Sequence, residues 1–154
     1  MTIYFLDSSA LVKRYAVEPG TMWVNQLCDP AHRHTLLIAS VTLVEVAAGF
    51  ATKRRSQEIT TEAYSQGLQD FIRDAAGQYR VLGVDQRVIA LGVTLTTRQK
   101  LRGYDAVQLA VALTVNAALV DQQLTPLTFV CADQDLLTAA SNEGFATVNP
   151  NSYP

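Results

Sequence analysis

Short segments rich in β-branched and aromatic residues alternate along the chain with longer segments in which apolar residues recur at helical spacing. The pattern predicts strands at residues 2–6, 35–39, 79–84, 127–131 and 146–148, with helices between them, the longest over 59–76 and 103–121. Consecutive parallel strands need a crossover long enough to hold a helix. The alternation therefore predicts an α/β fold in which helices cover both faces of a parallel sheet.

Short polar side chains stand where strands give way to helices. Asp7 directly follows the first strand and is expected to open a helix that runs to about residue 15. Ser40 or Thr42 is expected to cap the helix after the second strand, and Asp85 the helix after the third. Gly144 is expected to end the helix that begins near residue 133.

Composition narrows the class of protein. With 154 residues, 49% hydrophobic and 17% charged, the chain has the size of a single domain (1–154) and enough apolar residues for a core. It carries 12 Lys and Arg against 14 Asp and Glu, a formal net charge of -2. This balance argues against a polycation that coats nucleic acid, but it allows a local basic groove.

The sequence also predicts a cytoplasmic protein without a membrane partner. No apolar run approaches the ~20 residues that span a bilayer. The first residues lack a basic segment and reach Asp7 at once, unlike a signal peptide. Cys28 and Cys131 lie far apart in the chain, so buried, reduced thiols are expected rather than a disulfide.

Four acidic residues stand at unusual places. Asp7 follows the first strand and Asp133 the fourth, and in parallel sheets functional groups gather beyond the carboxyl ends of the strands. If those strands are neighbours, both carboxylates face one crevice. Glu45 and Asp105 stand in apolar helical runs with little room for a compensating cation. An unpaired carboxylate in such surroundings costs several kcal/mol or takes up a proton.

Four carboxylates that gather in one place need a positive partner at neutral pH. The hard cations Mg²⁺ and Mn²⁺ prefer oxygen ligands and keep some of their waters. An all-oxygen site can polarise a phosphoryl oxygen and lower the pKa of a bound water, which is the chemistry of phosphodiester hydrolysis. No Cys/His set has the spacing of a zinc site, and His32 and His34 are expected in a solvated loop.

Each acid also has a purely structural interpretation. Asp7 and Asp133 fit helix N-caps, and Asp105 fits a first-turn acid that the helix dipole favours. Glu45 fits a buried carboxylate that an Arg or Lys from elsewhere neutralises. Asp135 fits an exposed first-turn acid better than a metal ligand. The functional hypothesis therefore depends on the first four acids together.

Four segments carry a resemblance to a known family. In order they are Leu6-Asp7-Ser8-Ser9-Ala10-Leu11-Val12-Lys13, Ser40-Val41-Thr42-Leu43-Val44-Glu45-Val46, Tyr104-Asp105-Ala106-Val107-Gln108-Leu109-Ala110 and Thr128-Phe129-Val130-Cys131-Ala132-Asp133-Gln134-Asp135-Leu136-Leu137. With this order and spacing, essentially the whole chain resembles the PIN-domain nucleases, and most closely the VapC-like toxins of type II toxin–antitoxin pairs. The resemblance implies a three-layer α/β/α sandwich and Mg²⁺- or Mn²⁺-dependent cleavage of RNA.

Carried over residue by residue, the resemblance makes Asp7, Glu45, Asp105 and Asp133 the catalytic and metal-binding acids. Asp7 and Asp105 match the usual direct metal ligands, and Ser9 matches a hydroxyl two positions after the first acid. The resemblance also implies a homodimer and a small cognate antitoxin that blocks the site.

One position departs from the family's pattern. Cys131 stands where the family often has Thr or Ser before the Ala-Asp pair. A thiol does not match a hydroxyl in orienting acids or substrate, so that supporting role is in doubt while the four acids are intact.

An acidic metal site repels RNA unless cations lie nearby. The candidates form three groups: Lys13 and Arg14; Lys53, Arg54 and Arg55; and Arg98, Lys100 and Arg102. The third group precedes Asp105 and is placed to contact phosphate at the rim of the crevice. For each group the alternative is a solvated face or a helix C-terminus, and this alternative is favoured for residues 53–55.

The sequence also bears on three rival classes of protein. A phospho-signalling receiver domain would use Asp85, but it needs an acidic pair after the first strand and a Lys after the last, where this chain has Asp7-Ser8 and Val148-Asn149. A dinucleotide-binding domain needs a Gly-rich loop after the first strand, which the sequence lacks. A PIN-like fold that binds RNA or a protein without turnover stays open.

Overall fold

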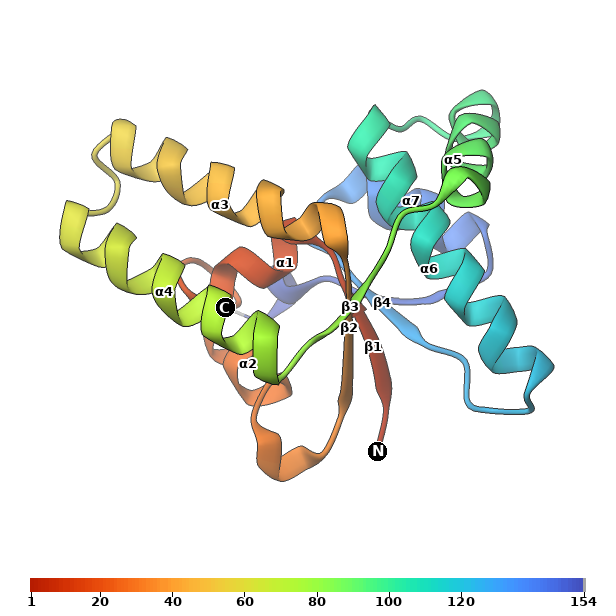
Figure 1. The fold of residues 1–154 in the computed structure, drawn as a ribbon, viewed down its shortest axis with the longest axis horizontal. Coiled ribbons are helices and arrows are strands. Elements are labelled where there is room, and N and C mark those ends of the chain that lie inside the picture. The colour runs from red at the N-terminus through yellow and green to blue at the C-terminus, as the bar shows by residue number, and fades with distance from the viewer. Residues whose placement is uncertain (154) are drawn as a thin grey trace.

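The molecule is a parallel sheet between two groups of helices (Figure 1). The computed structural model describes residues 1–153. In chain order the elements are β1 (Ile3–Leu6), α1 (Ser8–Leu11), a 3-10 turn (Val12–Arg14), α2 (Thr21–Leu27), a 3-10 turn (Pro30–His32), β2 (Thr35–Ala39), α3 (Ser40–Arg55), α4 (Thr61–Gly77), β3 (Arg80–Leu82), α5 (Gln86–Arg98), α6 (Gly103–Asp121), β4 (Thr128–Val130), α7 (Gln134–Asn142), β5 (Ala146–Val148) and a 3-10 turn (Pro150–Ser152).

The five strands of the sheet are parallel and lie in the order β3-β2-β1-β4-β5. The central strand β1 pairs with β2, where Phe5 lies beside Leu37, and with β4, where Phe5 lies beside Phe129. The predicted parallel sheet is confirmed. Because β1 and β4 are neighbours, the residues that follow them, Asp7 and Asp133, leave the sheet at the same edge.

Alternate residues of the central strands feed two separate cores, since successive strand side chains point to opposite faces. Phe5 and Phe129 stack with their ring centres 5.4 Å apart in the core under α5, α6 and α7. Leu6 and Val130 belong to the core under α1, α2, α3 and α4. Figure 1 shows α3 and α4 on one side of the sheet and α5, α6 and α7 on the other. The predicted three-layer α/β/α sandwich is confirmed.

Helix α6 corrects one expectation from the sequence. By length and composition alone it is apolar enough to cross a membrane, although no such run was expected. In this fold Ala106 and residues 108–112 are buried, and the helix packs against α5, β2, α3 and α7. Asp105 begins this buried stretch in the first turn of the helix.

The helix boundaries follow the sequence only in part. Asp85 caps α5 as predicted, accepting a hydrogen bond from the Val88 backbone N–H at 2.9 Å. The first helix is shorter than predicted, because the chain tightens into a 3-10 turn after Leu11. Neither Ser40 nor Thr42 caps α3: the extended residue at the N-cap is Ala39, and no side chain bonds to that end. Strand β2 therefore runs into α3 without a polar linker.

Candidate active site

Asp7 lies at the end of β1, buried where that strand meets β4. Its backbone N–H donates to the carbonyl of Val130 at 3.1 Å, which fixes the residue to the neighbouring strand. Its carboxylate accepts hydrogen bonds from the Ala10 backbone N–H at 3.1 Å and the Ser9 hydroxyl at 2.9 Å. The side chain does cap α1, as the structural interpretation proposed. These hydrogen bonds do not use all the lone pairs of the two carboxylate oxygens.

The charge of Asp7 is not balanced by any basic side chain. The residue is 3% exposed, and no Lys, Arg or His nitrogen of residues 1–153 lies within 4.0 Å of its carboxylate. Burial raises the pKa of Asp7 from 3.8 to about 7, although the hydrogen bonds from Ser9 and Ala10 oppose the rise. Burial thus opposes ionisation of this carboxyl, and a bound cation would favour the ionised form.

Ser9 joins Asp7 to the loop that follows β4. Its hydroxyl donates to Asp7 and accepts from the backbone N–H of Ala132 at 2.9 Å. The buried thiol of Cys131 lies 3.6 Å from the same hydroxyl and accepts from the backbone N–H of Asp133 at 3.2 Å. Cys131 thus does orient this loop, through backbone contacts. Ser9 thus contacts the first acid directly, and its functional role stays a prediction.

Glu45 lies on α3 and is held by two neutral donors. Ser8 donates its hydroxyl to one carboxylate oxygen at 3.0 Å, and Gln108 donates its amide N–H to the other at 2.8 Å. No Arg or Lys of the described chain forms an ion pair with Glu45, so the alternative of a basic partner is wrong. Sequence analysis missed Ser8 and Gln108. The available signal was a polar residue inside the apolar run of α6, one turn after Asp105.

Asp105 and Asp133 share one exposed cation. Asp133 caps α7 by accepting from the Leu136 backbone N–H at 3.0 Å. The Arg102 guanidinium lies 3.6 Å from Asp105 and 3.8 Å from Asp133, and its side chain is 86% exposed. Burial, then the charge of Asp133, raises the pKa of Asp105, and the charge of Glu45 adds to this. Asp133 and Glu45 are therefore close enough to Asp105 for their charges to affect its ionisation.

The acid cluster, defined as Asp7, Glu45, Asp105 and Asp133, lies at the carboxyl edge of the central strands. A hollow of about 300 Å³ opens beside it, lined by Lys100, Leu101, Arg102, Asp105, Asp133 and Asp135. Ser9 connects Asp7 to the loop of Asp133, and Ser8 and Gln108 connect Glu45 to α1 and α6. The topology thus brings the four predicted acids to the carboxyl edge of the sheet, with Asp7 buried and with Asp105 and Asp133 on the wall of the hollow.

The chemistry of the acid cluster fits a hard divalent cation. All its donors are carboxylate oxygens, and Arg102 is the one Lys or Arg in residues 1–153 that lies within 4.0 Å of any of them. No three His, Cys, Asp or Glu side chains of the described residues stand close enough together to hold an ion as they are placed. The donor chemistry is thus that of a hard-cation site, while the carboxylates stand further apart than the ligands of a formed coordination sphere.

The first group of predicted phosphate-binding cations is not free to contact RNA. Lys13 is only 4% exposed, and its ammonium pairs with Glu18 at 2.9 Å. Arg14 is half-buried and pairs with Asp74 at 3.4 Å, while donating to the Tyr79 hydroxyl at 2.8 Å. Each of these two candidates is held in an ion pair beside the core under α3 and α4, so neither is an exposed cation.

The other basic groups are also largely paired. Arg98 donates two hydrogen bonds of 2.8 Å to Glu143 of the α7 end, so it does not face the acid cluster. Lys53 pairs with Glu18 and Glu58, which agrees with the structural interpretation of that group. Lys100 pairs with Asp135 at 3.0 Å on the wall of the hollow. Arg102 is the member of the three groups that contacts the acids.

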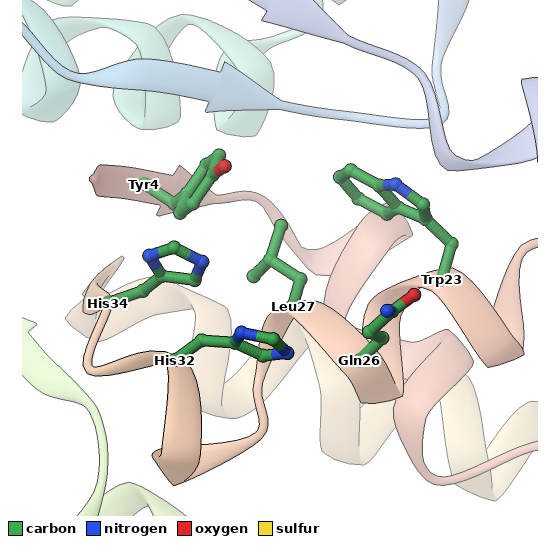
Figure 2. A pocket seen from close by; sticks show the side chains of 6 residues that line it. All are labelled: Tyr4, Trp23, Gln26, Leu27, His32 and His34. Carbon is green, nitrogen blue, oxygen red and sulfur yellow. The ribbon is translucent and has the colours of Figure 1, made fainter. Parts of the chain in front are cut away.

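The two histidines lie at the opposite edge of the sheet, where the strands begin. A hollow of about 200 Å³ lies there, and Figure 2 shows the side chains that line it: Tyr4, Trp23, Gln26, Leu27, His32 and His34. His32 is exposed, and its ring stacks on that of His34 with centres 5.7 Å apart. His34 is half-buried and accepts from the Thr2 backbone N–H at 3.2 Å. His32 is therefore solvated, as expected for this loop, whereas His34 is partly covered.

Comparison with solved structures finds proteins of the same fold. VapBC2 from Rickettsia felis, solved with a DNA fragment from its promoter, aligns with a TM-score of 0.65 and 17% identity over 96% of this chain and 98% of that chain. VapC20 from Mycobacterium tuberculosis, a sarcin–ricin loop cleaving toxin, gives 0.61 and 17% over 97% and 100%. PAE2754 from Pyrobaculum aerophilum gives 0.62 and 20% over 96% and 84%. At these identities the likeness establishes the fold.

Comparison with family models gives the family itself. No curated protein matches the sequence significantly. The model of the PIN domain matches residues 4–123, which is more than half of the chain and includes Asp7, Glu45 and Asp105. Asp133 lies beyond the matched segment, and the structure places it beside Asp105 through their shared contact with Arg102. The chain therefore belongs to the PIN domain family.

Proposed function

We propose that this protein is a Mg²⁺- or Mn²⁺-dependent ribonuclease that hydrolyses RNA phosphodiester bonds, and that it is the toxin of a type II toxin–antitoxin pair. The observation that carries the proposal is the buried carboxylate of Asp7, which has no basic partner and lies at the same sheet edge as three further acids. A divalent ion satisfies both the charge and the oxygen donors of such a site. Membership of the PIN domain family supports the nuclease activity.

In this mechanism Asp7 and Asp105 hold the ion, while Glu45 and Asp133 hold a second ion or order water. A bound Mg²⁺ or Mn²⁺ supplies stabilisation of the negative charge that develops on the phosphoryl oxygens, and it makes water a better nucleophile. Ser9 keeps the Asp7 carboxylate in place through its hydrogen bonds. By analogy with similar nucleases, the products should carry 5′-phosphate and 3′-hydroxyl ends.

A cleavage assay tests the proposal. Purified protein is incubated with structured RNA in Mg²⁺, in Mn²⁺ and in EDTA, and the products are resolved on a denaturing gel. We expect cleavage with either ion and none in EDTA. Cleavage that persists in EDTA would contradict the metal dependence. RNA binding without cleavage in any ion would favour the alternative, a catalytically silent PIN-like module that binds RNA or a protein.

The proposal includes a cognate antitoxin, a homodimer and a cytoplasmic location. Two solved structures of similar fold support the antitoxin: VapBC2 and a toxin–antitoxin complex from Klebsiella pneumoniae. The second aligns with a TM-score of 0.58 and 16% identity over 96% of this chain and 97% of that chain. An apolar groove of about 520 Å³ lies between α3 and α4, and two of the residues that line it, Val44 and Ile72, are 69% and 59% exposed. Exposed apolar surface of this kind is typical of a site that another protein covers. Light scattering of the purified protein would show whether it dimerises alone.

Arg102→Ala is expected to weaken RNA binding about 3- to 30-fold, because Arg102 is the exposed cation beside the acid cluster. Loss of one phosphate contact should also reduce the slope of log affinity against log salt by about 1. Fluorescence anisotropy with labelled RNA at several salt concentrations measures both. Arg73→Ala is the matched control, since Arg73 is 70% exposed on the distant helix α4. Equal losses in the two variants would mean that only overall charge matters.

A further inference from the structure

Two neutral side chains hold the Glu45 carboxylate between helices that are distant in the chain. Ser8 reaches it from α1 at 3.0 Å, and Gln108 reaches it from α6 at 2.8 Å, so each carboxylate oxygen accepts one hydrogen bond. A basic residue in either position would have neutralised the charge. A hydroxyl and an amide instead fix the direction of the carboxylate and leave its charge and part of its lone pairs unused.

The orientation of the Gln108 amide is set by Glu45. Gln108 is 1% exposed, and its amide nitrogen donates both to Glu45 and to the Thr42 hydroxyl at 2.8 Å. Its carbonyl oxygen is buried and has no hydrogen-bond partner in the described chain. Turning the amide over would place that oxygen against a carboxylate oxygen of Glu45, and the repulsion excludes this orientation. The amide therefore faces the carboxylate even though its own oxygen remains unpaired.

Packing alone does not explain a glutamine at this position. The neighbours Leu109, Ala110, Val111 and Ala112 are buried apolar residues, and a leucine or methionine would fill the same volume without a buried unpaired acceptor. Buried polar groups without partners are rare in folded proteins and call for an explanation. The contact with Glu45 supplies one, because it fixes the direction of a carboxylate that belongs to the acid cluster.

We propose that Gln108 and Ser8 are positioning residues that hold the Glu45 carboxylate toward the other three acids of the cluster and so raise the affinity of the cluster for a divalent cation. The inference rests on the proposed function, because it assigns a role within the proposed metal site. Neither residue touches the ion or the RNA in this role. Both act through Glu45, and the whole effect on the cation must disappear when Glu45 is changed.

The first test measures Mn²⁺ binding to the RNA-free protein by electron paramagnetic resonance. Gln108→Leu is expected to lower the affinity about 10- to 100-fold, as loss of a ligand-orienting partner does at other metal sites, and Ser8→Ala to lower it less. Ser8→Thr keeps the hydroxyl and should restore the wild-type affinity. In a Glu45→Gln background, Ser8→Ala and Gln108→Leu should cause no further loss. Wild-type affinity in both single variants, or equal losses with and without Glu45, would overturn the proposal.

The second test needs no metal and separates this inference from the proposed function. In the metal-free protein, the side-chain amide protons of Gln108 should exchange slowly with solvent and should shift in the proton–nitrogen NMR spectrum when Glu45 is changed to Gln. An unchanged Gln108 signal in Glu45→Gln would refute the positioning role whatever the protein binds. If the signal shifts but wild-type protein neither binds Mn²⁺ nor cleaves RNA, the proposed function fails and the positioning of Glu45 does not serve a cation. Thermal unfolding checks each variant, and Ser8→Ala at a half-buried site carries the test if Gln108→Leu does not fold.

Discussion

Asp7→Asn is expected to abolish RNA cleavage while stabilising the metal-free protein at neutral and alkaline pH. Loss of a metal-binding carboxylate should lower the cleavage rate on the order of 10³-fold or more. Without this ligand the ion would bind less well and would stabilise the transition state less. The gain in stability has a separate cause, which is that a buried carboxylate without a basic partner opposes folding when it is ionised.

The sign of the pH dependence follows from the raised pKa. Between the ordinary pKa of 3.8 and about 7, folded Asp7 keeps a proton that the unfolded chain has released. The free energy of unfolding therefore falls as pH rises through this window, by up to about 1.4 kcal/mol per pH unit, and levels off above it. Asn is neutral at every pH, so Asp7→Asn should lose the slope and gain on the order of 2–4 kcal/mol at pH 8.

Urea unfolding in EDTA at pH 5 and pH 8 measures this effect. Asp85→Asn is the matched control, because Asp85 is an exposed helix cap that makes the same kind of hydrogen bond, to the Val88 backbone N–H. It should show no gain at the higher pH. A divalent cation should reverse the order of stability, since it binds the ionised wild-type site and not the variant. Identical pH profiles for wild type and Asp7→Asn would show that the buried carboxyl has an ordinary pKa.

Gly20→Ala should lower the free energy of unfolding on the order of 3–5 kcal/mol, more than Gly144→Ala does. Gly20 begins α2 with φ of +91°, in the left-handed region that glycine tolerates best. An added Cβ would also stand 2.5 Å from the carbonyl oxygen of Pro150, in the 3-10 turn near the C-terminus. Both the backbone angle and the contact with Pro150 oppose the side chain.

Gly144→Ala separates these two costs. Gly144 has φ of +95° at the end of α7, but no atom lies within 4 Å of the position of an added Cβ. It should lose only the cost of the left-handed backbone, about 1–2 kcal/mol. Guanidinium unfolding of the two variants side by side gives both values. Equal losses would mean that the turn at Pro150 moves aside without cost and does not fix the start of α2.

Local signals in the sequence were sufficient for most of the fold. Strand β2, strand β5 and helix α6 have the predicted limits. Strand β2 and helix α6 are largely continuous apolar runs, and the polar or glycine residues beside them mark where each run ends. Strands β3 and β4 are shorter than the apolar runs that predicted them, since pairing with a neighbour and not apolarity ends a strand. The expected cap of α3 failed because Ala39 passes directly from strand to helix geometry.

The sequence by itself determined that this chain forms a parallel sheet flanked by helices and that Asp7, Asp105 and Asp133 stand at the starts of helices, because those signals lie within a few residues of each other. Only the tertiary structure decided which charges are neutralised. Glu45 lies 37 positions from Ser8 and 63 from Gln108, and its partners are hydrogen-bond donors that no periodicity marks. Whether an ionised group keeps its charge depends on burial and on the groups within a few ångströms, and folding sets both by joining distant segments.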